Sequence, residues 1–236
     1  MGRTALWTSI AATLRDEIGT ARYHPGDKLP TEAALSQRFG VNRHTVRRAL
    51  ADLAEAGLVH ARRGSGVFVA ARPTDYPLGR RVRFTRNLQA AGQTPDKRIL
   101  LRDTRSADRR EVEALALHPG AQVHVYEGIS LADGAPLALF RSVFPADRFP
   151  DLLPALEETR SVTAALTRAG LADYTRATTR LTAKLASPTQ ALHLGLREGA
   201  PILRSVAVNV DAQGIPVEYG HTWFAGDRIS LVVQPD

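Results

Sequence analysis

The sequence predicts an α+β protein of two domains, and three observations support this fold class. Residues 1–70 contain three helical hydrophobic patterns followed by a short pair of strands. Residues 80–236 contain a helix and two strands that occur twice, which predicts an antiparallel sheet. Residues 71–79 hold two prolines and show no hydrophobic periodicity, as expected of a linker.

The first two helices are read from their apolar spacing and their end residues. Residues 6–20 carry an apolar stripe at helical spacing and stop before a His-Pro-Gly turn. A second helix follows Leu-Pro-Thr-Glu, with Thr31 as its N-cap and Glu32 in its first turn. Gly40 ends this helix one residue before the next helical segment. The short connection predicts a helix-turn-helix.

The third helix, within residues 41–57, reads VNRHTVRRALADLAEAG. Asn42 is expected to cap it, and Gly57 to end it in a left-handed turn. Its buried stripe consists of Val46, Ala49, Leu50, Leu53 and Ala54. Its other face begins with a basic and polar group, which suits a recognition helix in a DNA major groove. The candidate DNA contacts here are Asn42, Arg43, His44, Thr45, Arg47 and Arg48, together with Thr31 and Glu32 of the second helix.

Two short strands follow the third helix and predict a hairpin with a basic, glycine-rich tip. Such a tip is a wing that can approach a groove or a phosphate closely. Its candidate DNA contacts are Arg62, Arg63, Gly64, Ser65 and Gly66. Residues 1–72 hold 11 Lys and Arg against 6 Asp and Glu, while the remainder holds 20 against 18. Most of the net charge of +7 therefore lies where DNA is expected to bind.

Composition limits the other functions. The chain has no cysteine, which excludes disulfides, thiolate nucleophiles and cysteine-based zinc sites. Its histidines lack metal-ligand spacing, and no nucleophile–base set is evident, so we expect no metal, no cofactor and no catalytic residue. No apolar run has the length of a membrane span or the form of a signal peptide. We expect a cytoplasmic protein without a membrane partner.

An internal repeat at a spacing of about 80 residues organises the second domain. The segment LHPGAQV at residues 117–123 parallels LREGAPI at residues 196–202, and each follows a short expected helix, at residues 108–117 and 187–196. An Asp/Gly turn with a nearby proline then precedes a second strand in both copies. We expect one sheet with helices packed against it, pseudo-twofold symmetry, and a cleft where the halves meet.

The first domain resembles the winged helix-turn-helix of GntR-family bacterial regulators. The resemblance covers residues 6–70 and rests on PGDKLPTE, VNRHTVRRA and GSGVFV. It implies that Arg43, Thr45 and Arg47 contact DNA from the recognition helix, and that Arg63 and Gly64 enter the minor groove. The residue after Glu32 is Ala33 here, where many family members carry arginine.

The second domain resembles the effector-binding (UTRA-like) domain of the HutC subfamily, whose fold is similar to chorismate lyase. VNRHTVRRA, DYPL and RFTRNL further resemble phosphonate-utilisation regulators of PhnF type. The resemblance implies a homodimeric repressor of phosphonate or phosphate genes that binds a palindromic operator and is released by a small anionic ligand. Sugar-phosphate-binding relatives carry Arg-x-Arg where Gly128 and Ser130 stand here.

Phosphonates and phosphate esters are held by arginines, hydroxyls and amides. Four arginines lie within residues 80–86, next to an expected helix start at residue 84 where an anion is favoured. Arg176, Thr178 and Arg180 alternate on an expected strand and should share one face. Glu218 occupies the place of a HutC-subfamily glutamate that faces the ligand. The effector candidates are Arg83, Thr85, Asn87, Arg141, Ser142, Arg176, Thr178, Arg180, Glu218, His221 and Thr222.

Three alternatives remain at this stage. The chain could regulate another pathway, with a sugar phosphate, an amino acid or urocanate as effector. It could be a lyase-like enzyme fused to a DNA-binding domain, although fold similarity does not transfer chemistry. It could also be an architectural DNA-binding protein without an effector. The sequence assigns neither the operator nor the sign of the effector's action.

Overall fold

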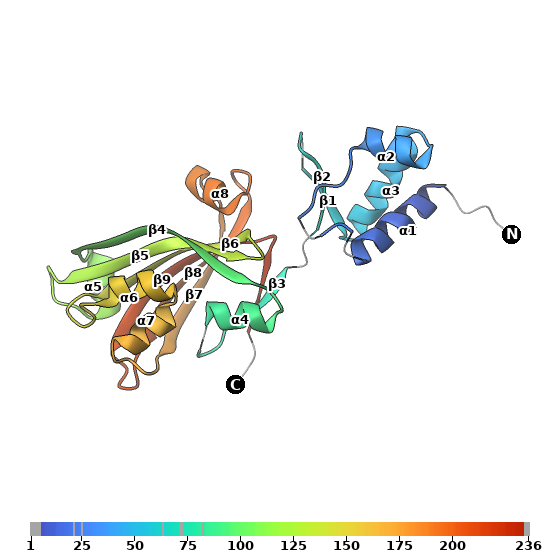
Figure 1. The fold of residues 1–236 in the computed structure, drawn as a ribbon. Coiled ribbons are helices and arrows are strands. Elements are labelled where there is room, and N and C mark those ends of the chain that lie inside the picture. The colour runs from blue at the N-terminus through green and yellow to red at the C-terminus, as the bar shows by residue number, and fades with distance from the viewer. Residues whose placement is uncertain are drawn as a thin grey trace. The chain divides into compact units, whose positions relative to one another are not determined.

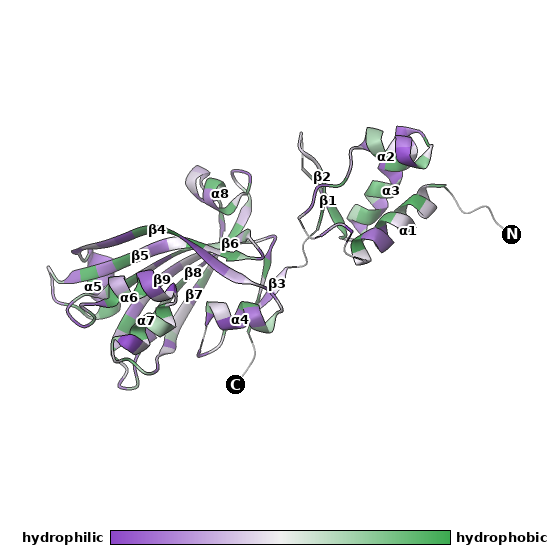
Figure 2. Cartoon of the chain, in the orientation of Figure 1, coloured by the Kyte–Doolittle hydropathy of each residue, from purple (hydrophilic) through white to green (hydrophobic). Residues whose placement is uncertain are grey.

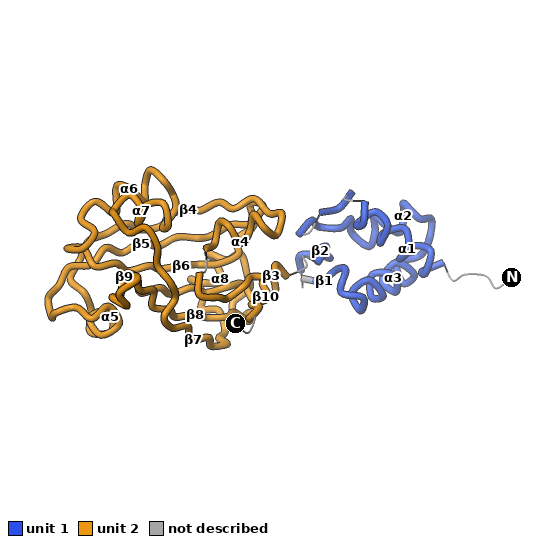
Figure 3. The backbone as a smooth tube through the Cα atoms, turned by 90° about the horizontal axis from the view of Figure 1, so that it is seen from below, with its two compact units in different colours: residues 1–72 blue, residues 73–236 orange. Residues whose placement is uncertain are grey.

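The computed structural model describes residues 6–20, 22–24, 26–62, 64–70, 73–81 and 83–233. The chain forms two compact units, residues 1–72 and 73–236 (Figure 3). Hydrophobic and hydrophilic residues occur together along the helices and strands of both units (Figure 2). Such amphipathic elements bury one side and expose the other. Within the described part of the chain, no helix is long and apolar enough to cross a membrane.

The described residues of the first unit form three helices and a hairpin (Figure 1). They are α1 (Leu6–Gly19), α2 (Glu32–Phe39), α3 (Arg43–Glu55), β1 (Val59–Arg62) and β2 (Gly66–Val69). The strands β1 and β2 pair antiparallel. Fully buried Leu14, Leu35 and Leu53, one from each helix, form the centre of its core. The predicted winged helix-turn-helix is confirmed.

The helix ends of this unit follow from their cap residues. The Thr31 hydroxyl accepts a hydrogen bond from the Ala34 amide at 3.2 Å, and Asn42 Oδ1 accepts one from the Thr45 amide at 2.9 Å. Each bond satisfies a donor that the first helical turn leaves unpaired. Gly57, at φ 68°, adopts the left-handed conformation that ends α3.

The prediction that residues 71–79 form a linker is wrong for the second half of this segment. Residues 71 and 72 lie outside the described residues. The next segment, β3 (Thr74–Pro77), pairs in parallel with β10 (Ile229–Val232), the last strand of the unit in sequence. Tyr76 supplies the reason, because its side chain is buried against the rings of Phe84 and Phe224. This stretch is therefore part of the second unit's core.

The second unit is built on a six-stranded antiparallel sheet of order β4-β5-β6-β9-β8-β7 (Figure 1). The first three strands in sequence are β4 (Pro95–Ser106), β5 (Gln122–Ala132) and β6 (Ala135–Pro145). The other three are β7 (Thr175–Leu185), β8 (Pro201–Val210) and β9 (Pro216–Ala225). Each repeat supplies three adjacent strands. Arg141 pairs with His221, its equivalent in the other repeat, so the pseudo-twofold axis passes between the central strands.

Two arginines at equivalent places tie the repeats together. Arg148 donates to the Pro216 carbonyl oxygen and to the Asp211 carboxylate. Arg228 donates to the Pro136 carbonyl oxygen, which is the equivalent position in the first repeat. Each arginine thus bonds to the hairpin of the opposite repeat. Arg228 also pairs with the preceding Asp227 at 3.8 Å and donates to the carbonyl oxygens of Leu194 and Gly195 in its own repeat.

Helices cover both faces of the sheet. The equivalent helices α5 (Arg109–Leu115) and α8 (Pro188–Leu194) pack on one face, against β9 and β6 respectively. The expected helices at residues 108–117 and 187–196 are thus confirmed. Three helices cover the other face, namely α4 (Phe84–Ala90), α6 (Leu152–Thr159) and α7 (Val162–Arg168). The pair α6 and α7 lies between the repeats in sequence, and the repeat pattern did not predict it.

Candidate DNA-binding surface and effector pocket

The start of α3 presents exposed basic and polar side chains. Arg43 and His44 are exposed on its first turn. The Thr45 hydroxyl donates to Asn42 Oδ1 at 2.9 Å, so the N-cap also fixes the rotamer of this threonine. The structure therefore brings Asn42, Arg43, His44 and Thr45 together at one helix end.

Arg47, one turn further on, is held by Glu32 of α2. Its Nε and Nη2 donate to the two carboxylate oxygens at 3.1 and 2.8 Å. The hydrogen bonds from Arg47 hold the pKa of Glu32 below its usual range. A bidentate pair of this kind fixes the plane of the guanidinium. Glu32 thus orients an arginine that remains 63% exposed.

Arg48 has a different neighbour. Its guanidinium lies 4.7 Å from the centre of the Trp7 ring in α1, a cation–π arrangement. Trp7 in turn packs against the core of the unit. Arg48 therefore joins α3 to α1, a role that the helical pattern alone did not reveal.

The wing has the expected backbone. Gly64 and Gly66 have φ values of 76° and 111°, which side-chain-bearing residues rarely adopt. A Cβ atom on Gly66 would lie 2.8 Å from Cε of Lys28, which crosses beside it. Ser65 is exposed between the two glycines. Arg63 and the side chain of Arg62 lie outside the described residues.

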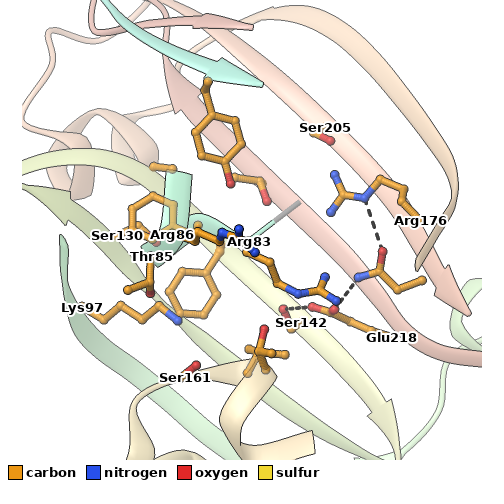
Figure 4. A pocket seen from close by; sticks show the side chains of 18 of the residues that line it. Arg83, Thr85, Arg86, Lys97, Ser130, Ser142, Ser161, Arg176, Ser205 and Glu218 are labelled. Atoms are coloured by element: carbon orange, nitrogen blue, oxygen red, sulfur yellow. Dashed lines mark hydrogen bonds between the residues drawn. The ribbon is translucent and has the colours of Figure 1, made fainter. Parts of the chain in front are cut away.

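A cavity of about 420 Å³ opens between the sheet and the helices α4 and α7 (Figure 4). It lies entirely within the second unit. Polar side chains from both repeats and from α4 and α7 surround a partly aromatic interior. The polar lining consists of Arg83, Thr85, Arg86, Gln89, Lys97, Ser130, Ser142, Ser161, Thr163, Tyr174, Arg176, Ser205, Asn209, Glu218 and Thr222.

Glu218 lies on the sheet side of this pocket and is 8% exposed. Ser142 Oγ donates to its Oε1 and Asn209 Nδ2 to its Oε2, both at 2.6 Å. Arg176 Nε donates to Asn209 Oδ1 at 3.3 Å (Figure 4). These bonds fix the carboxylate while leaving it acceptor capacity, since each oxygen has a second lone pair.

Arg83 closes the pocket near the start of α4. Its guanidinium stacks 3.8 Å from the centre of the Tyr174 ring and donates to the Tyr174 carbonyl oxygen at 2.9 Å. It also pairs with Asp173 at 3.3 Å. Burial raises the pKa of the Tyr174 hydroxyl to about 12, so this hydroxyl is neutral where it lines the pocket. It forms a hydrogen bond with the Thr163 hydroxyl at 3.0 Å. Arg83 therefore fastens α4 to the start of β7.

Six of the eleven predicted effector residues line the pocket. They are Arg83, Thr85, Ser142, Arg176, Glu218 and Thr222. Asn87 is on α4 but donates to the Pro77 carbonyl oxygen at 3.4 Å. Arg141 and His221 point to the opposite face of the sheet, because successive side chains alternate and their neighbours Ser142 and Thr222 face the pocket.

The prediction that Arg176, Thr178 and Arg180 share one face is wrong. A register shift between Arg176 and Thr178 leaves Ala177 without a partner on β8. Such a β-bulge reverses the alternation of all later side chains. Thr178 and Arg180 therefore line a groove on the far face, and only Arg176 reaches the pocket.

Lys97 and Asn209 are pocket residues that the sequence analysis missed. Lys97 is directly opposite Ser130 in the β4–β5 register, and both side chains reach the pocket. Asn209 pairs with Arg176 across β7 and β8. Recognising either residue requires the strand register, which the repeat pattern of the sequence does not define for the outer strands.

The comparisons with known proteins agree with this architecture. Residues 6–69 match the model of the gntR family of bacterial regulatory proteins, and residues 90–230 match the UTRA domain. A transcriptional regulator of Rhizobium meliloti, RB1450, is 37% identical over 98% of this chain and 95% of its own length. The probable transcriptional regulator PhnF of Escherichia coli is 34% identical over 97% and 94%.

The fold also has a solved counterpart. The crystal structure of PhnF from Mycobacterium smegmatis superposes with a TM-score of 0.65 at 24% identity, covering 98% of this chain and 99% of that one. These families and relatives are regulators rather than enzymes, which removes the lyase alternative. A winged helix-turn-helix followed by a UTRA domain, with these relatives, places the chain in the GntR family of bacterial transcriptional regulators.

Proposed function

We propose that this regulator represses genes for the uptake or catabolism of phosphonates or phosphate compounds, and that a small anionic ligand in the UTRA domain controls it. The observation that carries the proposal is the pocket, in which Lys97 and Arg176 approach from opposite edge strands toward the buried Glu218. Cationic groups in a sheltered pocket favour an anion. The names of the E. coli and M. smegmatis relatives support the phosphonate assignment.

For DNA binding, we propose a homodimer on a palindromic operator. Each recognition helix α3 would enter a major groove with Arg43, His44 and Thr45, while Glu32 directs Arg47 toward the DNA. The wing tip at residues 62–66 would contact the adjacent backbone or minor groove. A twofold operator follows from a twofold dimer.

The proposed control runs through β3 and α4. Tyr76 of β3 and several residues of α4 line the pocket, and β3 is the first strand after the winged unit. A ligand that contacts Tyr76 or Thr85 would therefore act on the segment that leads to the DNA-binding unit. Ligand and operator would then weaken each other's binding by the same factor.

The proposal is tested by thermal unfolding of the full chain with inorganic phosphate, methylphosphonate, 2-aminoethylphosphonate, glucosamine 6-phosphate and urocanate. A ligand that binds only the folded protein raises its melting temperature with concentration. We expect a saturable rise with a phosphonate or phosphate. A rise with urocanate alone, or with no compound, would contradict the proposal.

A further inference from the structure

We propose that Lys97 binds the phosphonate or phosphate group of the ligand and that Glu218 binds an ammonium group, so that the pocket selects an aminoalkyl phosphonate or phosphate. This inference rests on the proposed function, because it requires that the UTRA pocket be the effector site. It assigns one protein residue to each end of the ligand, and it specifies that the ligand carries a negative group at one end and a positive group at the other.

Lys97 is a half-buried cation of the pocket. Its side chain reaches the pocket from β4, and its Nζ lies 5.6 Å from the centre of the Phe140 ring. Among the residues that the structure describes, none forms a hydrogen bond or an ion pair with this ammonium group, although the backbone amide of Lys97 donates to Asp96 Oδ1 at 2.7 Å. Burial lowers the pKa of the ammonium group, although Glu218 partly offsets this effect. An anion bound at Lys97 would stabilise the charged form.

Of the other cations of the pocket, two are already engaged, and the third, Arg86, is an exposed residue of α4. Arg83 is stacked on Tyr174 and paired with Asp173, while Arg176 donates to Asn209 and so supports Glu218. We therefore assign the anion to Lys97, which is half-buried and has no bonded partner for its ammonium group. The hydroxyls of Ser130 and Thr85 line the same pocket and can donate to phosphonate oxygens.

The packing around Lys97 depends on a glycine. A Cβ atom on Gly128 would lie 2.9 Å from Cζ of Phe140 and 2.7 Å from the Arg98 carbonyl oxygen. The absence of a side chain at this position lets the Phe140 ring lie close against β5 and beneath the Lys97 ammonium. The proposed anion site is thus built on the neighbouring strand β4, where Lys97 lies opposite Ser130.

Glu218 supplies the opposite charge. Its two oxygens each accept one hydrogen bond, from Ser142 and Asn209, and retain lone pairs for a ligand donor. The pocket lining is predominantly positive, with Glu218 as its carboxylate and with the cations Lys97, Arg83, Arg86 and Arg176. A phosphonate dianion joined to one ammonium carries a net charge of −1, so it complements both the excess of cations and the carboxylate. Figure 4 shows Lys97 and Arg176 entering from opposite sides, with Glu218 and Ser142 between them.

The test is isothermal titration calorimetry of the full chain with 2-aminoethylphosphonate and with ethylphosphonate, which lacks the ammonium. We expect the wild type to bind 2-aminoethylphosphonate at least tenfold more tightly. Lys97→Met should weaken both ligands at least tenfold, whereas Glu218→Gln should abolish only the preference for the amine. Lys184→Met is the matched control, because Lys184 is an exposed lysine on the opposite edge strand and outside this pocket.

Each result decides a separate point. If Lys97→Met binds both ligands as the wild type does, the anion assignment is wrong while the proposed function stands. If the wild type binds both equally, the ammonium assignment is wrong. If it binds neither, the phosphonate function and this inference fail together. Ser130→Ala provides a second, milder variant, and we expect it to weaken both ligands.

Discussion

Replacing Arg148 with methionine should destabilise the UTRA domain in a pH-dependent way. Arg148 donates to Asp211, whose side chain is 3% exposed and which also accepts from the amides of Gln213 and Ile215. Removing one partner of a buried ion pair costs about 3–5 kcal/mol. Because two amide donors remain and Arg148 is 31% exposed, we expect a loss of about 2 kcal/mol in the free energy of unfolding at pH 7.

The pH dependence follows from Asp211. Burial alone would raise the pKa of its carboxyl, but hydrogen bonds from Arg148 and from the backbone amides outweigh burial and lower it. A lowered pKa in the folded state adds stability above the unfolded value of about 4, which is lost as the pH falls through the folded value. The difference between wild type and Arg148→Met should therefore shrink as the pH falls below about 4.

Urea unfolding followed by Trp223 fluorescence measures this difference. The chain has two tryptophans, so a Trp7→Phe background reports on the UTRA domain alone. Arg160→Met is the control, because its pair with Asp96 spans 3.6 Å between side chains that are 61% and 63% exposed. Such surface pairs contribute about 0–1 kcal/mol. Equal costs for both variants, or a cost for Arg148→Met that does not change with pH, would refute the role of Arg148.

Two further predictions concern single side chains. Arg43→Ala should reduce the preference for specific over random DNA, which fluorescence anisotropy measures. Arg48→Ala loses the contact with Trp7, so it should change that preference less but lower the melting temperature of the winged unit, which calorimetry measures. The reverse pattern would contradict both assignments. Burial, with Arg204 and Arg141 nearby, lowers the pKa of His221 to about 4, so unfolded chains bind the proton first and stability should fall between about pH 6.5 and 4. The pKa of the His221 ring can be measured by NMR titration, and a measured value near 6.5 would contradict this prediction.

Local chemistry made much of the fold predictable. Thr31 and Asn42 are efficient N-caps wherever a helix follows, and the glycines after α2 and α3 end those helices. The repeat in the second domain revealed two equivalent hairpins because their turns carry the same Asp, Gly and Pro residues. These features depend on residues close in sequence, so they can be read from one chain.

The parts that sequence analysis missed depend on distant partners. The strand β3 forms only because Tyr76 meets Phe224 and because β10 lies beside it. The bulge at Ala177 adds one residue without changing the run of Thr and Arg around it, so Arg176 and Arg180 appeared to share a face. Lys97 occurs in a strand without clear hydrophobic alternation, and its place in the pocket follows from pairing with β5.

The most direct measurement is selection of duplexes from a random DNA pool by the full chain, with and without the ligand that raises its melting temperature. We predict enrichment of an inverted-repeat sequence, with reduced enrichment at saturating ligand. Loss of enrichment for Arg43→Ala would link that sequence to α3. Recovery of no preferred sequence, or of one whose binding the ligand does not change, would contradict a regulator controlled through its UTRA domain.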